Sequence, residues 1–110
     1  MPELNLKIVG EAMLAKGEEA LKGHWAAARP YATTEFRKLA ETGKMIVDGV
    51  RDGSINPAQA RILLSMQEGA SRAVLTAIEA IGIIAAQDAI NAALGVLKEA
   101  INTAAGFAVL

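Results

Sequence analysis

Residues 77–97, AIEAIGIIAAQDAINAALGVL, hold only two charged side chains, Glu79 and Asp88, in 21 positions. No proline and no cluster of turn-forming residues interrupts the segment. Three environments accommodate such a stretch: the interior of a membrane, the core of the chain itself, and an interface between subunits. The choice among them determines both the fold and the function of the protein.

The composition indicates a soluble helical chain with more apolar content than one small core requires. Of the 110 residues, 53% are hydrophobic and only 4% aromatic, so the apolar content is mostly Ala, Ile, Leu and Val. Soluble domains contain roughly 45–50% apolar residues even when glycine is included. The formal net charge is −1, and no cluster of Lys or Arg is present, so nucleic acid is not expected as a partner. The excess of apolar residues points to protein partners instead.

The N-terminal segment and the absence of cysteine restrict the cellular context and the chemistry. The first twenty residues lack a basic stretch followed by a long apolar run, so we expect no signal peptide and a cytoplasmic protein. The chain has no cysteine, which excludes disulfides, thiolate metal sites and cysteine nucleophiles. His24 stands alone, without a second ligand at metal-binding spacing, and no phosphate-binding or nucleophile motif is present. We therefore expect a non-enzymatic protein without metal or cofactor.

The chain divides into a charged half and an apolar half. Residues 1–56 carry eight basic and eight acidic side chains, whereas residues 57–110 carry three and four. Between them, Asp52 and Gly53 form a turn dipeptide, Asn56 is a good N-cap, and Pro57 suits the first position of a helix. With Gln59 completing a capping box, these residues predict a helix that begins at Pro57. The predicted organisation is a single all-α domain: a charged amphipathic helical pair over 1–52, a turn over 53–56 and an apolar oligomerisation helix over 57–110.

Two amphipathic helices are predicted in the charged half. The first covers about residues 4–29, and Pro30 is expected to end or kink it, with Thr33 or Thr34 capping the next helix. The second helix has one apolar stripe at three- and four-residue spacing. The residues of this stripe are Phe36, Leu39, Ala40, Gly43, Ile46, Val47 and Val50.

The apolar half favours one long helix, with a hairpin as the alternative. Between Pro57 and Gly106 the glycines stand singly among strong helix formers. A continuous helix of this length would span roughly 75 Å, so a fold-back near Gly82 remains open. The polar residues of this half form one narrow stripe, interrupted only at Ile83 and at Leu94 or Gly95. The polar stripe consists of Arg61, Ser65, Glu68, Arg72, Thr76, Glu79, Gln87, Asn91, Lys98 and Asn102.

A helix that is apolar over most of its circumference predicts self-association. The two N-terminal helices can cover about two of its sides, and exposed apolar patches beyond a few hundred Å² mark interaction sites. We therefore expect a homo-oligomeric bundle or larger particle, in which the charged N-terminal helices face solvent or a second protein. The predicted interface comprises Leu63, Met66, Ala70, Val74, Ile78, Ile81, Ile84, Ala85, Asp88, Ala89, Ala92, Val96, Phe107 and Leu110.

Asp88 helps to decide whether the apolar segment is buried in a protein interface or in lipid. It lies in the middle of residues 80–97, the best candidate for a membrane span, where an acidic residue costs about 2.5–3.5 kcal/mol. A spanning helix is therefore not favoured, although a C-terminal helix that inserts into or lies on a bilayer is the alternative function. Within an interface, Asp88 either pairs across subunits and fixes the register, or lies at the edge of the polar stripe and reaches water. An adaptor that holds a different protein is the third possibility.

Overall fold

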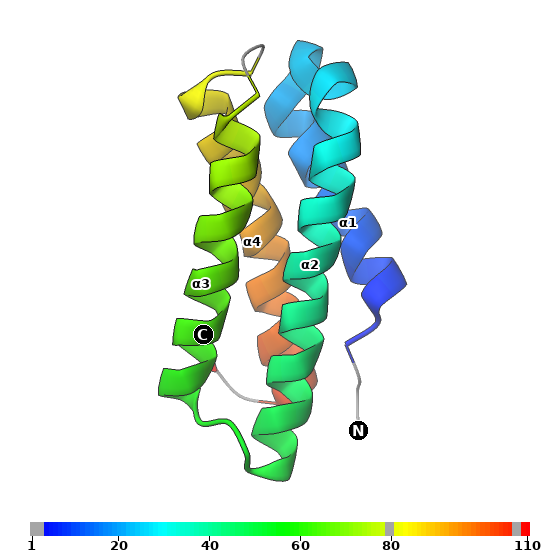
Figure 1. The fold of residues 1–110 in the computed structure, drawn as a ribbon. Coiled ribbons are helices and arrows are strands. Elements are labelled where there is room, and N and C mark those ends of the chain that lie inside the picture. Colours follow the sequence, from blue (N-terminus) through cyan, green and yellow to red (C-terminus); the bar gives the residue numbers. More distant parts are fainter. Residues whose placement is uncertain (1–3, 79–80, 107–108) are drawn as a thin grey trace.

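The chain folds as an up-down-up-down bundle of helices. The computed structural model describes residues 4–78, 81–106 and 109–110, and in these ranges every regular element is a helix. The elements are α1 (Leu6–Leu21), a 3₁₀ turn η1 (Lys22–His24), α2 (Trp25–Asp52), α3 (Pro57–Thr76) and α4 (Ile83–Ala105). Successive α-helices run in opposite directions along the long axis of the molecule (Figure 1). The all-α prediction is confirmed.

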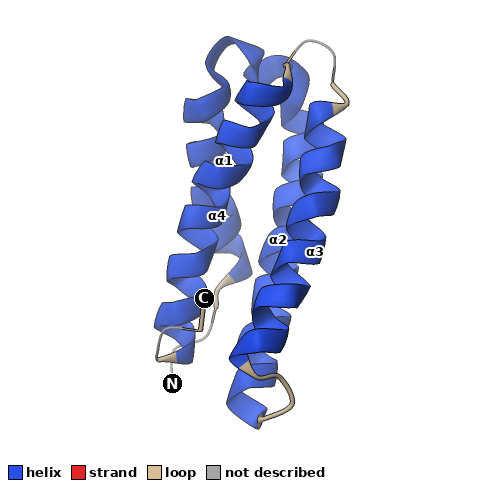
Figure 2. Cartoon of the chain, turned by 90° about the vertical axis from the view of Figure 1, so that its left-hand side faces the viewer, coloured by secondary structure: helices blue, strands red, loops and turns tan. Residues whose placement is uncertain are grey.

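The four α-helices do not contribute equally to the centre of the bundle. α4 packs against all three other helices, whereas α3 contacts α2 and α4 and, within the described residues, not α1. Two views show α1 beside α4 and α2 beside α3 (Figures 1 and 2). α2 also contacts all three other α-helices, so α2 and α4 form the centre of the bundle. α1 and α3 each have a side without a neighbour among the described residues.

The boundary between the first two helices was predicted at the wrong place. The break lies at η1, where Lys22 has a positive φ of 48°, and α2 continues through Pro30. Pro30 stands in the second turn of α2, where its fixed φ suits a helix and its missing N–H removes a single intrahelical hydrogen bond. The remainder of α2 follows the prediction, since its predicted apolar stripe is buried, with Val50 half-buried.

The turn between α2 and α3 has the predicted chemistry. Gly53 ends α2 in the left-handed conformation, with φ 85°. The Asn56 carboxamide oxygen accepts from the Gln59 backbone N–H, and the Gln59 side chain accepts from the Asn56 N–H, both at 2.9 Å. This capping box satisfies two backbone donors that a helix start otherwise leaves unpaired. The prediction of a helix from Pro57 is confirmed.

The favoured prediction of one long C-terminal helix is wrong, and the alternative of a hairpin is correct. α3 ends at Thr76, and α4 begins at Ile83 after Gly82, which has φ 81°. Helix propensity alone gives no reason to stop here, but folding back lets α4 bury one side against α1 and α2. Ile90, Leu97 and Ile101 are each fully buried in this way. Tertiary burial of apolar surface outweighs the local preference for a continuous helix.

Glycines inside the helices allow their axes to approach closely. A β-carbon on Gly43 would lie 2.7 Å from Leu97 of α4, and one on Gly17 would lie 2.5 Å from Phe36 of α2. Cβ atoms essentially never approach other heavy atoms this closely, so an alanine at either position would require the facing side chain or the helix axes to shift. These two glycines set the spacing of α2 against α4 and α1.

Candidate functional site

The side of α3 that faces away from the bundle is apolar. Its residues are spaced three and four apart, which places them on one face of the helix. Ile62 and Met66 are 61% and 68% exposed, and the small residues that follow are exposed as well. We call this surface the α3 outer face, and it consists of Ile62, Met66, Gly69, Ala70, Ala73 and Ala77. None of its side chains is charged or polar.

The polar side of α3 lies beside α4, with Glu68 and Arg72 half-buried and Arg61 and Ser65 exposed. Arg72 Nη2 lies 3.3 Å from Asn91 Oδ1 of α4 and 3.7 Å from Glu68 Oε1. Arg61, Ser65, Glu68 and Lys98 line a hollow of about 160 Å³ between the two helices, together with Leu64 and Leu110. The hairpin thus brings the two halves of the polar stripe together. Arg72 and Asn91 pair across the two helices. α3 buries Leu64 and Leu75 in the core, and its outer apolar side remains in solvent.

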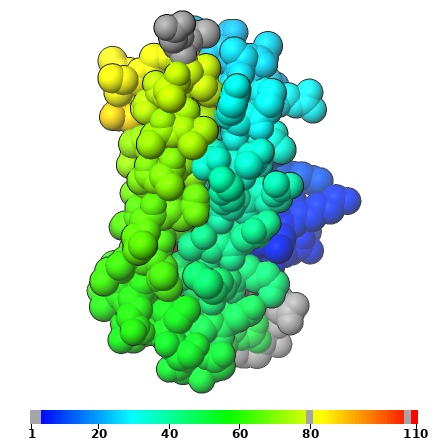
Figure 3. Space-filling view, in the orientation of Figure 1, coloured from blue at the N-terminus to red at the C-terminus, as the bar shows by residue number. Residues whose placement is uncertain are grey.

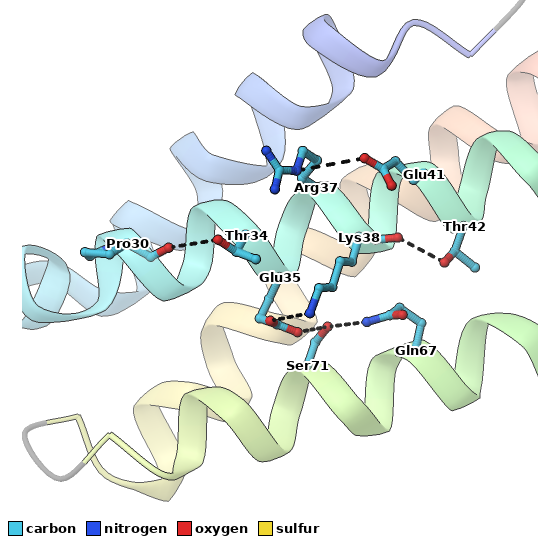
Figure 4. Close-up of polar contacts among 9 residues, drawn as sticks. All are labelled: Pro30, Thr34, Glu35, Arg37, Lys38, Glu41, Thr42, Gln67 and Ser71. Atoms are coloured by element: carbon cyan, nitrogen blue, oxygen red, sulfur yellow. Dashed lines mark hydrogen bonds and ion pairs between the residues drawn. The ribbon is translucent and has the colours of Figure 1, made fainter.

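A buried polar network fixes α3 against α2. The Ser71 hydroxyl donates to Glu35 Oε1 at 3.1 Å, and the Gln67 amide donates to the Ser71 oxygen at 3.1 Å (Figure 4). Lys38 Nζ lies 3.3 Å from the other Glu35 oxygen. Glu35 is 4% exposed and Ser71 is fully buried. Among the described residues, no buried side-chain nitrogen or oxygen lacks a partner. The network therefore determines which side of α3 faces the bundle and which side faces solvent.

The structure divides the predicted interface residues among three environments. Ile81 and Ala89 are buried within the chain, and Asp88 is exposed on the surface of the single chain. Phe107 lies outside the described residues. The half-buried members are Leu63, Val74, Ile78, Ala85, Ala92, Val96 and Leu110. The exposed apolar members are Met66, Ala70 and Ile84.

Sequence reasoning missed the residues that complete this surface. Ile62, Gly69, Ala73 and Ala77 share a helical face with Met66 and Ala70, and their spacing was the available signal. We expected the polar stripe to face solvent and the apolar side of the helix to be covered by neighbouring subunits. The buried position of Glu35 was also missed, since nothing in its local sequence separates it from the other charges of α2.

A smaller exposed apolar patch lies where α4 begins. Ile83 and Ile84 are 62% and 77% exposed, and they border a shallow hollow with Ala20 and Asp88. We call Ile83 and Ile84 the end patch. It lies at the end of the bundle where α1 ends and α2 begins (Figure 1).

The described residues contain no candidate metal site. No group of three or more His, Asp or Glu side chains in this part of the chain is placed to hold a metal ion. Among the described helices, none combines the length and apolar character that crossing a membrane requires. Comparisons with protein-family models, with curated proteins and with solved structures give no match.

Proposed function

We propose that this protein is a non-enzymatic assembly protein that associates with copies of itself through the α3 outer face. One observation carries the proposal: α3 directs Ile62 and Met66 into solvent while Glu68 and Arg72 are half-buried against α4. The inner side of α3 contributes Leu64 and Leu75 to the core, so α3 carries apolar side chains on two sides, of which the bundle covers only one. An exposed apolar face whose orientation is fixed by a buried hydrogen-bond network indicates a surface that binds protein.

This proposal differs from the sequence prediction in the position of the interface. A continuous C-terminal helix would have left most of its apolar surface for neighbouring subunits. In the bundle, α1 and α2 cover much of α4, so burial of Ile81 and Ala89 within the chain removes them from the proposed interface. The surface available to a partner is the outer face of α3, together with the edge of α2 beside it. These two helices form one side of the molecule (Figure 3).

The test is the mass of the protein in detergent-free buffer, measured by sedimentation over a wide range of concentrations. We expect a species larger than the 11.5 kDa chain, with a population that rises with concentration. Met66→Glu should weaken association by at least about tenfold, because it places an unpaired charge in the interface.

The matched control is Ile8→Glu, which introduces the same charge at a similarly exposed isoleucine of α1. Ile8→Glu should associate like the unmodified protein. A wild-type monomer at every concentration would overturn the proposal, and so would equal weakening by the two substitutions.

The end patch favours one alternative function, attachment to a membrane surface. Two adjacent exposed isoleucines at one end of a bundle suit shallow insertion into a bilayer, and this mode needs no spanning helix. Under this alternative the protein floats with liposomes, and Ile83→Ser with Ile84→Ser abolishes flotation. Flotation that Met66→Glu abolishes, and that the end-patch variant retains, would assign lipid binding to α3 and contradict both functions.

A further inference from the structure

We propose that two copies pair through their α3 outer faces in an antiparallel arrangement, with the two-fold axis beside Gly69 and Ala70. This inference rests on the proposed function, since it specifies the geometry of the same interface. The occupant of the face is thus a second copy of this chain.

The first argument is the distribution of side-chain sizes along the face. The two large side chains, Ile62 and Met66, lie in the N-terminal half of α3, and the C-terminal half contains only alanines. In an antiparallel pair centred between Gly69 and Ala70, Ile62 lies opposite Ala77 of the partner subunit. Met66 likewise lies opposite Ala73 of the partner subunit. Each large side chain therefore meets a small one, which is how close-packed interfaces fill their volume.

A parallel arrangement of two α3 helices would pack the same surface poorly. It would place Ile62 against its own counterpart and Met66 against its own counterpart, while alanine met alanine at the other end. The distance between two helix axes is set by the side chains between them, at 8–10 Å. A parallel pair would be held apart at one end and would leave a gap at the other. Only the antiparallel pair keeps one spacing along its whole length.

The neighbouring edge of α2 has the same complementarity. Tyr31, Lys38 and Met45 are seven residues apart, two helical turns, and Lys38 adjoins α3 through Glu35. The Glu35–Ser71 hydrogen bond sets the level of α2 against α3, so Tyr31 lies near the C-terminal end of α3 and Met45 near its N-terminal end. An antiparallel two-fold axis places the α2 helices of both copies on the same side of the pair. Tyr31 of one copy then approaches Met45 of the partner subunit.

The charges along this surface allow two copies of the chain to approach each other closely. The face itself has no ionisable group, and Lys38, on the adjoining edge of α2, is 3.3 Å from the Glu35 carboxylate. The two Lys38 side chains therefore enter the pair already neutralised. Tyr31 and Met45 are 52% and 48% exposed, so each has surface left to bury.

The available area predicts a reversible dimer. The molecule measures 43 × 23 × 18 Å, so one whole long side presents roughly 800–1,000 Å², close to the 800 Å² that each partner contributes to a standard interface. The α3 outer face spans about 22 Å of that length, from Ile62 to Ala77. The face therefore covers about half of that side, which gives an interface below the standard size, where association depends on concentration within the usual experimental window.

Cysteine cross-linking tests the geometry, because the unmodified chain contains no cysteine. Ala70→Cys, beside the axis, should form a disulfide-linked dimer with itself under mild oxidation. Ile62→Cys and Ala77→Cys should each give little dimer alone but should cross-link efficiently when mixed. The mass of the mixed dimer identifies it. Disulfide formation requires Cα atoms within about 7 Å, so these patterns report the register directly.

The control and the outcomes separate this inference from the proposed function. Ala15→Cys, exposed on α1, should not cross-link above background. Self-linking of Ile62→Cys with no linking to Ala77→Cys would establish a parallel pair and overturn the geometry, while self-association would stand. Cross-linking confined to Ile84→Cys would place the contact at the end patch and would also overturn the inference. A monomer by sedimentation at every concentration would overturn both.

Discussion

Removal of the Ser71 hydroxyl should destabilise the fold far more than removal of an exposed hydroxyl from the same helix. Ser71 is fully buried and donates to Glu35 Oε1, and it accepts a hydrogen bond from Gln67. Ser71→Ala leaves one oxygen of a 4% exposed carboxylate without a donor inside the protein. Hydrogen bonds to charged groups contribute about 1.5–3 kcal/mol, so we expect a loss of that size in the free energy of unfolding.

The assay is urea unfolding followed by circular dichroism at 222 nm, at a concentration where the chain is monomeric. Ser65→Ala on the exposed side of α3 is the control and should change the free energy by less than about 0.5 kcal/mol. A second substitution separates the hydrogen bond from the cavity that the missing oxygen leaves. Glu35→Met replaces the carboxylate with an apolar side chain of similar length, so no buried charge remains unpaired.

The double variant measures the interaction free energy between Glu35 and Ser71. If Glu35 and Ser71 interact as the structure shows, Glu35→Met with Ser71→Ala should be less destabilised than the sum of the single variants. We expect a coupling of about 1–2 kcal/mol, within the range for residues in one hydrogen-bond network. Additive losses, or a Ser71→Ala protein as stable as the Ser65→Ala control, would refute this account of how α3 is held.

Three further predictions test the fold. Gly43→Ala should destabilise by about 1–3 kcal/mol because its β-carbon collides with Leu97, whereas Gly95→Ala, with open space around it, should stabilise α4 by up to about 1 kcal/mol; urea unfolding measures both. Gly82→Ala should cost about 1–2 kcal/mol in the same assay, because φ is 81° there and an L-residue is strained. The Ser54 hydroxyl and backbone N–H lower the pKa of Asp52, so its contribution is present above the ordinary carboxyl pKa and is lost as the pH falls through the lowered value. The difference in unfolding midpoint between Asp52→Asn and the unmodified protein should therefore shrink on acidification.

The sequence predicted elements wherever local chemistry is sufficient to define them. The capping box at Asn56 and Gln59 identified the start of α3, and three- and four-residue spacing identified the buried side of α2. The hairpin between α3 and α4 was not predictable in this way. Its local signals are a single glycine and no turn cluster, and what favours it is the burial of Ile90 and Leu97 against distant helices.

The sequence did not predict which side of α3 is exposed, and the physical reason is the direction in which α3 faces. A sequence pattern shows that α3 has a polar side and an apolar side, but not which of them the bundle covers. The choice depends on Glu35, which is in another helix and binds Ser71 from across the α2–α3 contact. α3 has apolar residues on two sides, so the usual rule that the apolar side faces inward does not decide which side enters the core.

The exposed outer side of α3 links the fold to the proposed interface. Fully burying a side chain such as Ile62 or Met66 contributes about 1.5–3 kcal/mol relative to exposing it, and α3 forgoes much of this for both residues. Turning α3 over to bury them would expose Leu64 and Leu75, which lie in the core, so the chain alone covers only one of the two apolar sides. Pairing of two α3 outer faces would bury Ile62 and Met66 without disturbing the core or the polar contacts to α4. A second copy would therefore cover the apolar surface that the single chain leaves in solvent.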